Sequence, residues 1–220
     1  MSKMAFALKS RMHEMSDRDF EDQLGLSKTE FLEHLDEMAA IEAGCIAELG
    51  ASAPDFEAHL LDDDGGVSTE MLTLSGMPTL PIGLIFGCYT CPIFRRQTDG
   101  MKDIIQRYAE RVRFLFVYVI EAHPTDGWNT PSNKAENIMV HQPQSLSERA
   151  AIAHEWRNAY RLEKPILLDW PDNRINTAYS GSPERLYVLD SERIVQFKSD
   201  QGPYDDGHLD DWAKALANVS

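Results

Sequence analysis

The chain has 220 residues, of which 43% are hydrophobic and 26% charged, so it is long enough for one globular domain with a complete core. Its formal net charge of −15 argues against nucleic acid and anionic membrane surfaces as partners. With three cysteines, no recognisable secretory leader and no long apolar stretch, the sequence excludes a disulfide framework and favours a soluble, cytoplasmic protein.

The N-terminal third is predicted to be largely helical. A helix begins after the N-cap Ser27, carries an apolar stripe and is expected to end at Gly50. Cys45 lies on this stripe, and we interpret it as a small buried hydrophobe rather than a reactive thiol. The acidic, glycine-rich stretch that follows is the best candidate boundary. We therefore divide the chain into an N-terminal helical extension (residues 1–66) and a main domain (residues 67–220).

A buried strand, a CxxC pair and a helix then follow one another. The apolar run Leu80–Phe86 predicts the strand, Cys88 and Cys91 form the pair, and Pro92 suits the first turn of a helix that runs to about Arg111. Cys91 would thus sit at a helix N-terminus, where partial positive charge and unpaired N–H groups stabilise a thiolate. The pattern favours a redox or nucleophilic pair over structural cysteines. Metal binding is disfavoured, since no second CxxC or histidine pair completes four ligands.

A second predicted strand brings polar residues to the same place. The run Arg113–Ile120 completes a strand–helix–strand unit, and Glu121 and His123 follow it directly. Because ligands bind outside the carboxyl ends of strands in open α/β sheets, Cys91 and these two residues should share one rim of the sheet. Glu121 and His123 could form an acid–base relay. Alternatively, His123 caps backbone groups, and Glu121 is a surface carboxylate or the partner of Arg185.

The remaining elements complete an α/β pattern. They are a polar connection over residues 129–144 that contains His141, a helix from Ser145 to about Leu162, a strand at Pro165–Asp169, a short helix at Asn173–Tyr179, a hairpin of Arg185–Leu189 and Arg193–Lys198, and a closing helix at Leu209–Asn218. This order is that of a thioredoxin-like fold, with a central mixed sheet flanked by helices. The extra strand and short helix before the hairpin resemble the insertions of peroxiredoxins and their relatives.

Several motifs resemble the iodothyronine deiodinase family. Phe86–Phe94 (FGCYTCPIF) is similar to the active-site motif of that family, in which a Gly-Ser-Cys-Thr run precedes selenocysteine and a proline pair. Val117–Trp128 (VYVIEAHPTDGW) resembles the strand and Glu-Ala-His-x-x-Asp-Gly-Trp loop of the family. The similarity continues through Gly202-Pro203. It spans about Leu80 to Leu216 and leaves residues 1–75 outside.

The resemblance implies reductive removal of iodide from an aromatic ring. Cys91 stands at the position of the catalytic selenocysteine, Tyr118 at that of a strand tyrosine, and Glu121, His123 and His141 at those of polar active-site residues. In this chemistry the chalcogen engages iodine and a histidine network supplies the proton. A thiol or thioredoxin-type reductant, rather than a bound cofactor or metal, resets the enzyme. Cys88 would be the resolving thiol, and the family acts as dimers, so we expect a homodimer.

Further expectations concern substrate binding, and the chain departs from the family at several positions. Pro183 precedes a strand where thioredoxin-like folds keep a cis-proline. We group it with Tyr118, Arg185 and Trp128 as candidate substrate contacts, although Trp128 also fits simple packing. Sulfur in place of selenium should slow turnover. Tyr89 replaces a cysteine of the family, and Gln201 replaces an arginine implicated in substrate binding.

Two other functions use the same residues differently. A thiol–disulfide oxidoreductase or peroxiredoxin-like peroxidase would use the same cysteine pair, with Thr90 assisting a peroxide substrate. The order of attack also stays open, because Cys88 could act first as the leading cysteine of a CxxC motif. The third possibility is a non-enzymatic scaffold or redox sensor whose N-terminal helices recruit a partner.

Overall fold

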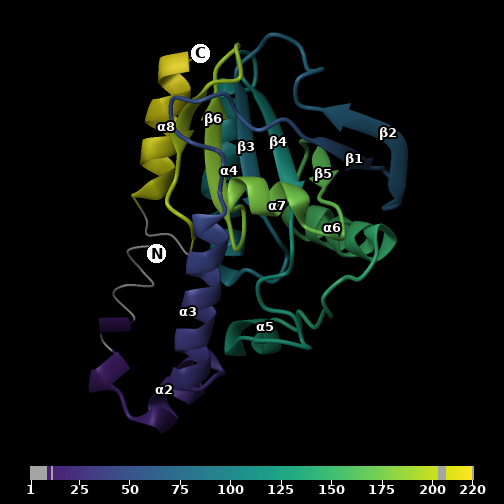
Figure 1. Cartoon of the computed structure of the whole chain (residues 1–220). Helices are drawn as coiled ribbons and strands as arrows, with labels where there is room; N and C mark the ends of the chain where they lie inside the picture. The colour runs from purple at the N-terminus through teal and green to yellow at the C-terminus, as the bar shows by residue number, and fades with distance from the viewer. Residues whose placement is uncertain (1–8, 11, 203–206, 220) are drawn as a thin grey trace.

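The computed structural model describes residues 9–10, 12–202 and 207–219 and has a mixed sheet at its centre (Figure 1). The strand order is β2-β1-β5-β4-β3-β6-β7. The strands are β1 (Glu57–Leu61), β2 (Val67–Thr73), β3 (Ile82–Gly87), β4 (Arg113–Tyr118), β5 (Ile166–Leu168), β6 (Arg185–Leu189) and β7 (Val195–Lys198). The helices are η1 (Met12–Glu14), α2 (Asp17–Leu24), α3 (Lys28–Ala43), α4 (Pro92–Tyr108), α5 (Pro131–Ala135), α6 (Leu146–Tyr160), α7 (Arg174–Tyr179) and α8 (His208–Val219). The predicted α/β class with a mixed sheet flanked by helices is confirmed.

The three central strands, β4, β3 and β6, bring their connecting segments together at one edge of the sheet. β3 and β4 are parallel and in register to their carboxyl ends, where Gly87 pairs with Tyr118. On its other side β3 runs antiparallel to β6, so that Phe86 lies opposite Arg185 at the start of that strand. The segments that follow β3 and β4 and precede β6 therefore meet at one edge of the sheet. This is the rim predicted for the cysteine pair.

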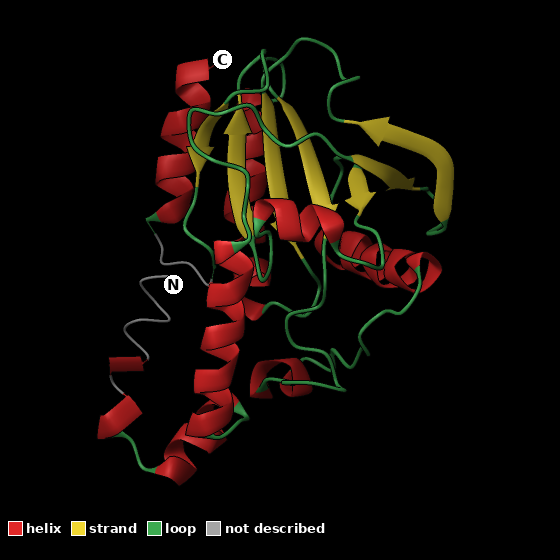
Figure 2. Cartoon of the chain, viewed as in Figure 1, coloured by secondary structure: helices red, strands yellow, loops and turns green. Residues whose placement is uncertain are grey.

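Two apolar layers cover the sheet (Figure 2). On one face α4, α6 and α8 pack against the strands, with Trp156 and Trp212 fully buried. The other face is covered by α7 and by residues 44–56, which form the crossover segment, with Tyr179 and Phe56 in contact at a ring-centroid distance of 5.8 Å. β3 and β4 are buried on both faces, which explains their nearly continuous apolar sequences.

The first long helix ends earlier than predicted. It stops at Ala43, because the backbone N–H groups of Ile46 and Ala47 donate to the carbonyl of Ala178 at 3.0 and 3.1 Å. These bonds draw the chain out of the helical path and onto the sheet. Cys45 becomes a buried member of the core beneath the sheet, as its interpretation as a small hydrophobe requires.

The stretch named as the candidate boundary contains a strand of the sheet. Within residues 51–66, β1 pairs antiparallel with both β2 and β5 and so belongs to the sheet. Only Ala58 and Leu61 of this strand are buried, and this pattern is too short and irregular to recognise in the sequence. No element was predicted for residues 57–61. The division at residue 66 remains a prediction, and Pro203 lies outside the described residues.

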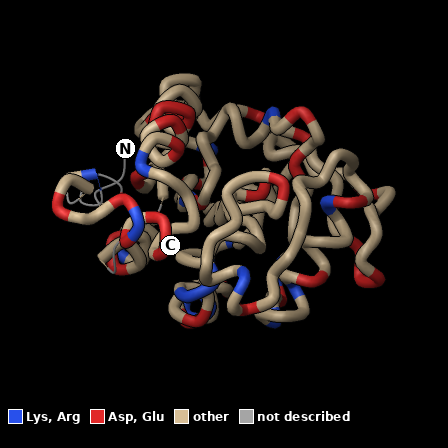
Figure 3. The backbone as a smooth tube through the Cα atoms, turned by 90° about the horizontal axis from the view of Figure 1, so that it is seen from below, with Lys and Arg blue, Asp and Glu red and all other residues tan. Residues whose placement is uncertain are grey.

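Acidic residues outnumber basic ones, with 36 Asp and Glu against 21 Lys and Arg in the full sequence. Asp and Glu are spread around the molecule, and Lys and Arg are interspersed among them (Figure 3). Across the described ranges, no helix combines the length and the apolar character that spanning a membrane would require.

Candidate active site

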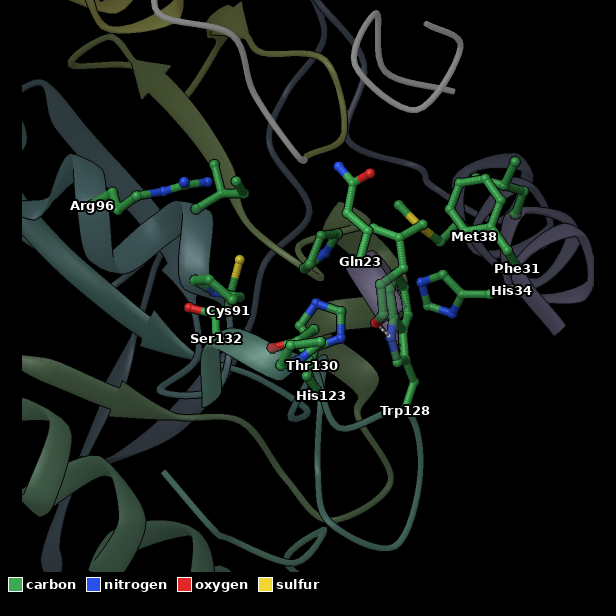
Figure 4. Close-up of a pocket in the computed structure, with 16 residues that line it drawn as sticks. Gln23, Phe31, His34, Met38, Cys91, Arg96, His123, Trp128, Thr130 and Ser132 are labelled. Atoms are coloured by element: carbon green, nitrogen blue, oxygen red, sulfur yellow. Dashed lines mark hydrogen bonds between the residues drawn. The ribbon is translucent and has the colours of Figure 1, made fainter. Parts of the chain in front are cut away.

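Cys91 joins β3 to α4 and faces a cavity. It occupies the N-cap of α4, Pro92 takes the first helical position, and the cysteine is 1% exposed. Its thiol borders a cavity of about 340 Å³, which lies between α4 and the N-terminal helices (Figure 4). A volume of this size is typical of sites for small organic molecules.

The far wall of this cavity comes from α3, which the sequence analysis did not place there. Phe31, His34 and Met38 lie on the side of α3 that faces Cys91 across the cavity (Figure 4). Their spacing along one helix face was visible in the sequence, but nothing in it identified the surface they pack against. The candidate site thus combines residues from both sides of the predicted division at residue 66.

Trp128 connects this wall to the rest of the site. Its indole N–H donates to the carbonyl of Leu24 at 2.7 Å, which holds the end of α2 in place. The rings of His34 and His123 contact Trp128 edge-on, at centroid distances of 4.9 and 4.4 Å. Phe31 makes a similar contact at 6.3 Å. Trp128 therefore both packs and lines the cavity.

Burial dominates the acidity of both thiols near the site. It raises the pKa of Cys91 well above that of a free thiol, and the carboxylate of Glu184 and the thiol of Cys88 add to the effect. The backbone N–H groups of Ile93 and Phe94 oppose this rise but do not reverse it. The prediction of a stabilised thiolate at this helix terminus is therefore wrong in direction, because burial outweighs the favourable N–H groups.

Cys88 lies deeper, behind the cavity wall. It is completely buried, and its sulfur accepts a hydrogen bond from the backbone N–H of Ala122 at 3.3 Å. The hydroxyl of Thr90 lies 3.6 Å from the same sulfur. Burial and the carboxylate of Glu121 raise the pKa of Cys88. Of the two predicted thiols, only Cys91 borders the cavity.

Glu121 is the centre of a buried hydrogen-bond network. The hydroxyl of Tyr118 donates to one carboxyl oxygen, and the hydroxyl and backbone N–H of Thr90 donate to the other at 2.7 and 3.0 Å. Burial raises the pKa of Glu121, while these donors favour its ionised form. Gln142 fixes the backbone of Glu121 through two hydrogen bonds of 3.0 Å. Thr90 therefore links Glu121 to Cys88.

His123 joins this network through its backbone rather than its ring. Its N–H donates to the Thr90 hydroxyl at 3.0 Å, and no hydrogen bond connects its ring to Glu121. The ring lies against Trp128 and borders the cavity, with Nδ1 buried and unpartnered. Burial lowers the pKa of His123 to about 3, and His34 adds to the effect. The imidazole is neutral near pH 7, which suits it to hydrogen bonding with a ligand.

Of three other predicted site residues, only Pro183 lines the cavity. The peptide bond between Ser182 and Pro183 is cis, as predicted, and Pro183 lines the cavity. Arg185 is 2% exposed and pairs with Glu42 of α3, so the alternative of a pair with Glu121 is wrong. The side chain of His141 is 79% exposed and lies 3.8 Å from Asp126, outside the cavity lining.

Gln201 is not among the residues that line the cavity. It is buried, and its amide group donates to Ser180 and to the backbone carbonyl of Ser182 at 3.1 and 3.2 Å. Within the described part of the chain, no group of three or more His, Cys, Asp or Glu side chains is arranged to hold a metal ion.

Comparison with known proteins identifies the family. The family model described as iodothyronine deiodinase matches residues 2–216, so the match reaches well beyond the expected span into the N-terminal helices. The type II iodothyronine deiodinase of Sus scrofa is 28% identical over 173 residues, covering 71% of this chain and 64% of that protein. The Rattus norvegicus type II enzyme is 29% identical over 165 residues, covering 74% and 57%. The chain thus spans less than two thirds of these relatives.

Solved structures support the fold. Peroxidoxin BcpB from Mycobacterium tuberculosis matches with a TM-score of 0.53 at 14% identity, covering 79% of this chain and 98% of that one. The thioredoxin domain of a thiol-disulfide oxidoreductase from Bacteroides vulgatus gives a TM-score of 0.51 at 13% identity, covering 79% and 99%. At these identities the likeness concerns the fold alone, and it is the thioredoxin-like fold that the sequence predicted.

Proposed function

This chain belongs to the iodothyronine deiodinase family, and on that premise we propose that it removes iodide reductively from an iodinated aromatic substrate, with a thiol as cosubstrate. The observation that carries the proposal is the position of Cys91. By the resemblance of its motif it stands where the family has its reactive chalcogen, and it is the thiol that borders the cavity. The apolar lining from Phe31, Met38 and Ile93 suits an aromatic ring.

In the proposed reaction, the sulfur of Cys91 attacks iodine rather than carbon. The S–I bond forms as the C–I bond breaks, and the ring carbon retains the bonding pair and takes up a proton. The Cys88 thiolate then displaces iodide from Cys91, which gives a Cys88–Cys91 disulfide. A dithiol reductant restores both thiols. The sum is Ar–I plus two thiols giving Ar–H, iodide, a proton and one disulfide.

The buried network suits the second step of this sequence. Cys88 must lose its proton to attack, and the Thr90 hydroxyl lies between its sulfur and the Glu121 carboxyl group. A proton can pass from the thiol to the hydroxyl while the hydroxyl proton moves to Glu121, which makes Glu121 the general base. Tyr118 holds the carboxyl group in place from the other side.

The neutral ring of His123 suits the first step. The ring borders the cavity close to Cys91 and, being neutral, can form a hydrogen bond with the substrate or with the water that delivers the proton (Figure 4). We keep His141 only as a candidate contributor through water, since its side chain lies at the surface near Asp126.

A second candidate function is thiol–disulfide exchange or peroxide reduction with the same pair. The Glu121–Thr90 network favours it, because any dithiol mechanism requires deprotonation of the resolving thiol. In this case the cavity would admit a peroxide or a substrate thiol, and Cys91 would again be the attacking residue.

The test is iodide release from an iodothyronine in excess dithiol. Wild type should release iodide, Cys91→Ala should release none, and Cys88→Ser should release it more slowly, because the external dithiol must then take the place of the resolving thiol. Cys45→Ser is the matched control, since Cys45 is buried outside the site. Absence of iodide release from wild type, with reversible formation of the Cys88–Cys91 disulfide, would reject deiodination and favour the second function.

A further inference from the structure

The charge of the cavity differs from that of the whole chain. Among the described residues that line it there is no Asp, Glu or Lys, and Arg96 supplies the only permanent charge. The other titratable groups on its walls are Cys91, His34 and His123. Burial lowers the pKa of both histidines, and burial raises that of Cys91, so all three are neutral near pH 7. The side chains that line the cavity therefore carry one permanent charge, which is positive, in a chain of net charge −15.

Arg96 is available for a ligand, whereas its neighbour is not. Arg95 is buried, donates to the carbonyl of Tyr89 at 2.9 Å and pairs with Glu136 at 3.0 Å. Arg96 is exposed and forms no ion pair with a described residue, although its charge helps to lower the pKa of Glu136, the partner of Arg95. Figure 4 shows its side chain extending from α4 on the same side of the cavity as Cys91, opposite the residues of α3.

The same lining gives no partner to a positively charged group. An ammonium ion inside the cavity would lose its water shell without gaining a carboxylate, and it would be repelled by Arg96. A carboxylate would instead gain a guanidinium, which can bind it through two parallel hydrogen bonds. The lining thus discriminates between ligands that have the same aromatic rings but carry substituents of different charge.

We propose that the cavity selects aromatic ligands that carry a carboxylate and no ammonium group, and that Arg96 binds this carboxylate at the cavity mouth. The inference rests on the proposed function for the iodinated ring, and it goes further in naming the charge of the substrate and the residue that recognises it. The ring then lies between Arg96 and the wall formed by Phe31, His34 and Met38, with Cys91 beside it.

The test is calorimetric binding without added dithiol, so that no turnover is needed. Three ligands with the same iodinated diphenyl ether are compared: the arylacetic acid, the amino acid and the amine without a carboxylate. Wild type should bind them in that order of decreasing affinity. Arg96→Gln should weaken binding of the acid about fivefold and abolish its advantage over the amine, while Arg96→Lys retains part of it. Arg107→Gln, an exposed arginine near the end of the same helix, is the matched control.

Equal affinity of wild type for the acid and the amine would overturn the proposal, as would equal losses from Arg96→Gln and Arg107→Gln or failure of all three ligands to bind. Two further results separate it from the proposed function. Selective binding of the acid without iodide release would reject deiodination and support this inference. Iodide release with no preference for the acid would support deiodination and reject this inference.

Discussion

Replacing Thr90 by valine removes one hydroxyl from the buried network and keeps the shape of the side chain. The hydroxyl donates to Glu121 at 2.7 Å and accepts the backbone N–H of His123 at 3.0 Å. Its loss takes one donor from a buried carboxyl group and leaves a buried N–H without an acceptor. At about 1.5 kcal/mol for each effect, we expect Thr90→Val to lower the free energy of unfolding by about 3 kcal/mol.

Thr98→Val is the matched control. Thr98 is also buried, but its hydroxyl only donates to the carbonyl of Phe94 one turn earlier in the same helix, at 3.1 Å. Its loss should cost about 1 kcal/mol or less. Equilibrium unfolding in urea measures both values. If the two variants were equally stable, the network around Thr90 would contribute nothing beyond an ordinary buried hydroxyl.

The same variant tests the proposed relay to Cys88. In Thr90→Val the Cys88–Cys91 disulfide should form at least about tenfold more slowly, because the proton path to Glu121 is interrupted. Thr90→Ser should restore most of the rate, since it keeps the hydroxyl. Rapid quench followed by thiol labelling measures disulfide formation directly. An unchanged rate in Thr90→Val would refute the assignment of Glu121 as the base for Cys88.

Three further predictions concern acidity and packing. Alkylation of Cys91 by iodoacetamide should be slow at neutral pH and accelerate into the alkaline range, because burial raises its pKa and only the thiolate reacts; a flat rate between pH 7 and 9 would contradict this. Glu42→Ala should lower the free energy of unfolding in urea by about 2 kcal/mol, because it removes the Glu42 carboxylate from the buried guanidinium of Arg185. Glu33→Ala on the same helix should change this free energy little. Trp128→Phe should cost about 1 kcal/mol and increase hydrogen exchange in α2, through loss of the bond to Leu24; unchanged exchange would show that α2 is held elsewhere.

The centre of the fold was predictable because its signals are local. β3 and β4 are nearly continuous apolar runs, and Pro92 marks the start of α4 directly after the cysteine pair. Parallel pairing of the two strands then brings Thr90 and Glu121 to one rim without further information. Glu121 could therefore be assigned to this rim from the sequence, whereas Tyr118 was named only through the resemblance and Gln142 was not named as a site residue.

The parts that were missed depend on distant contacts. The early end of α3 follows from hydrogen bonds to Ala178, and α5 lies within a stretch whose polar sequence predicted only a loop. The pKa of Cys91 was predicted in the wrong direction, because its position at a helix terminus is a local property and its burial is not. The cavity wall of α3 was missed for the same reason, since the sequence shows an amphipathic face but not its partner.

The crossover segment has a consequence for the order of events during synthesis. Gly50 and Ala53 donate backbone hydrogen bonds of 2.8 Å to Val195 and Arg193, and Val195 donates to Ala51 at 2.9 Å. These partners leave the ribosome more than a hundred residues after the segment itself. At about 5–20 residues per second, the nascent N-terminal third waits on the order of ten seconds before it can close over the sheet. During that interval the crossover segment and the edge of β1 that later pairs with β5 have not met these partners, so we expect them to be the parts of the nascent chain most open to chaperones and proteases.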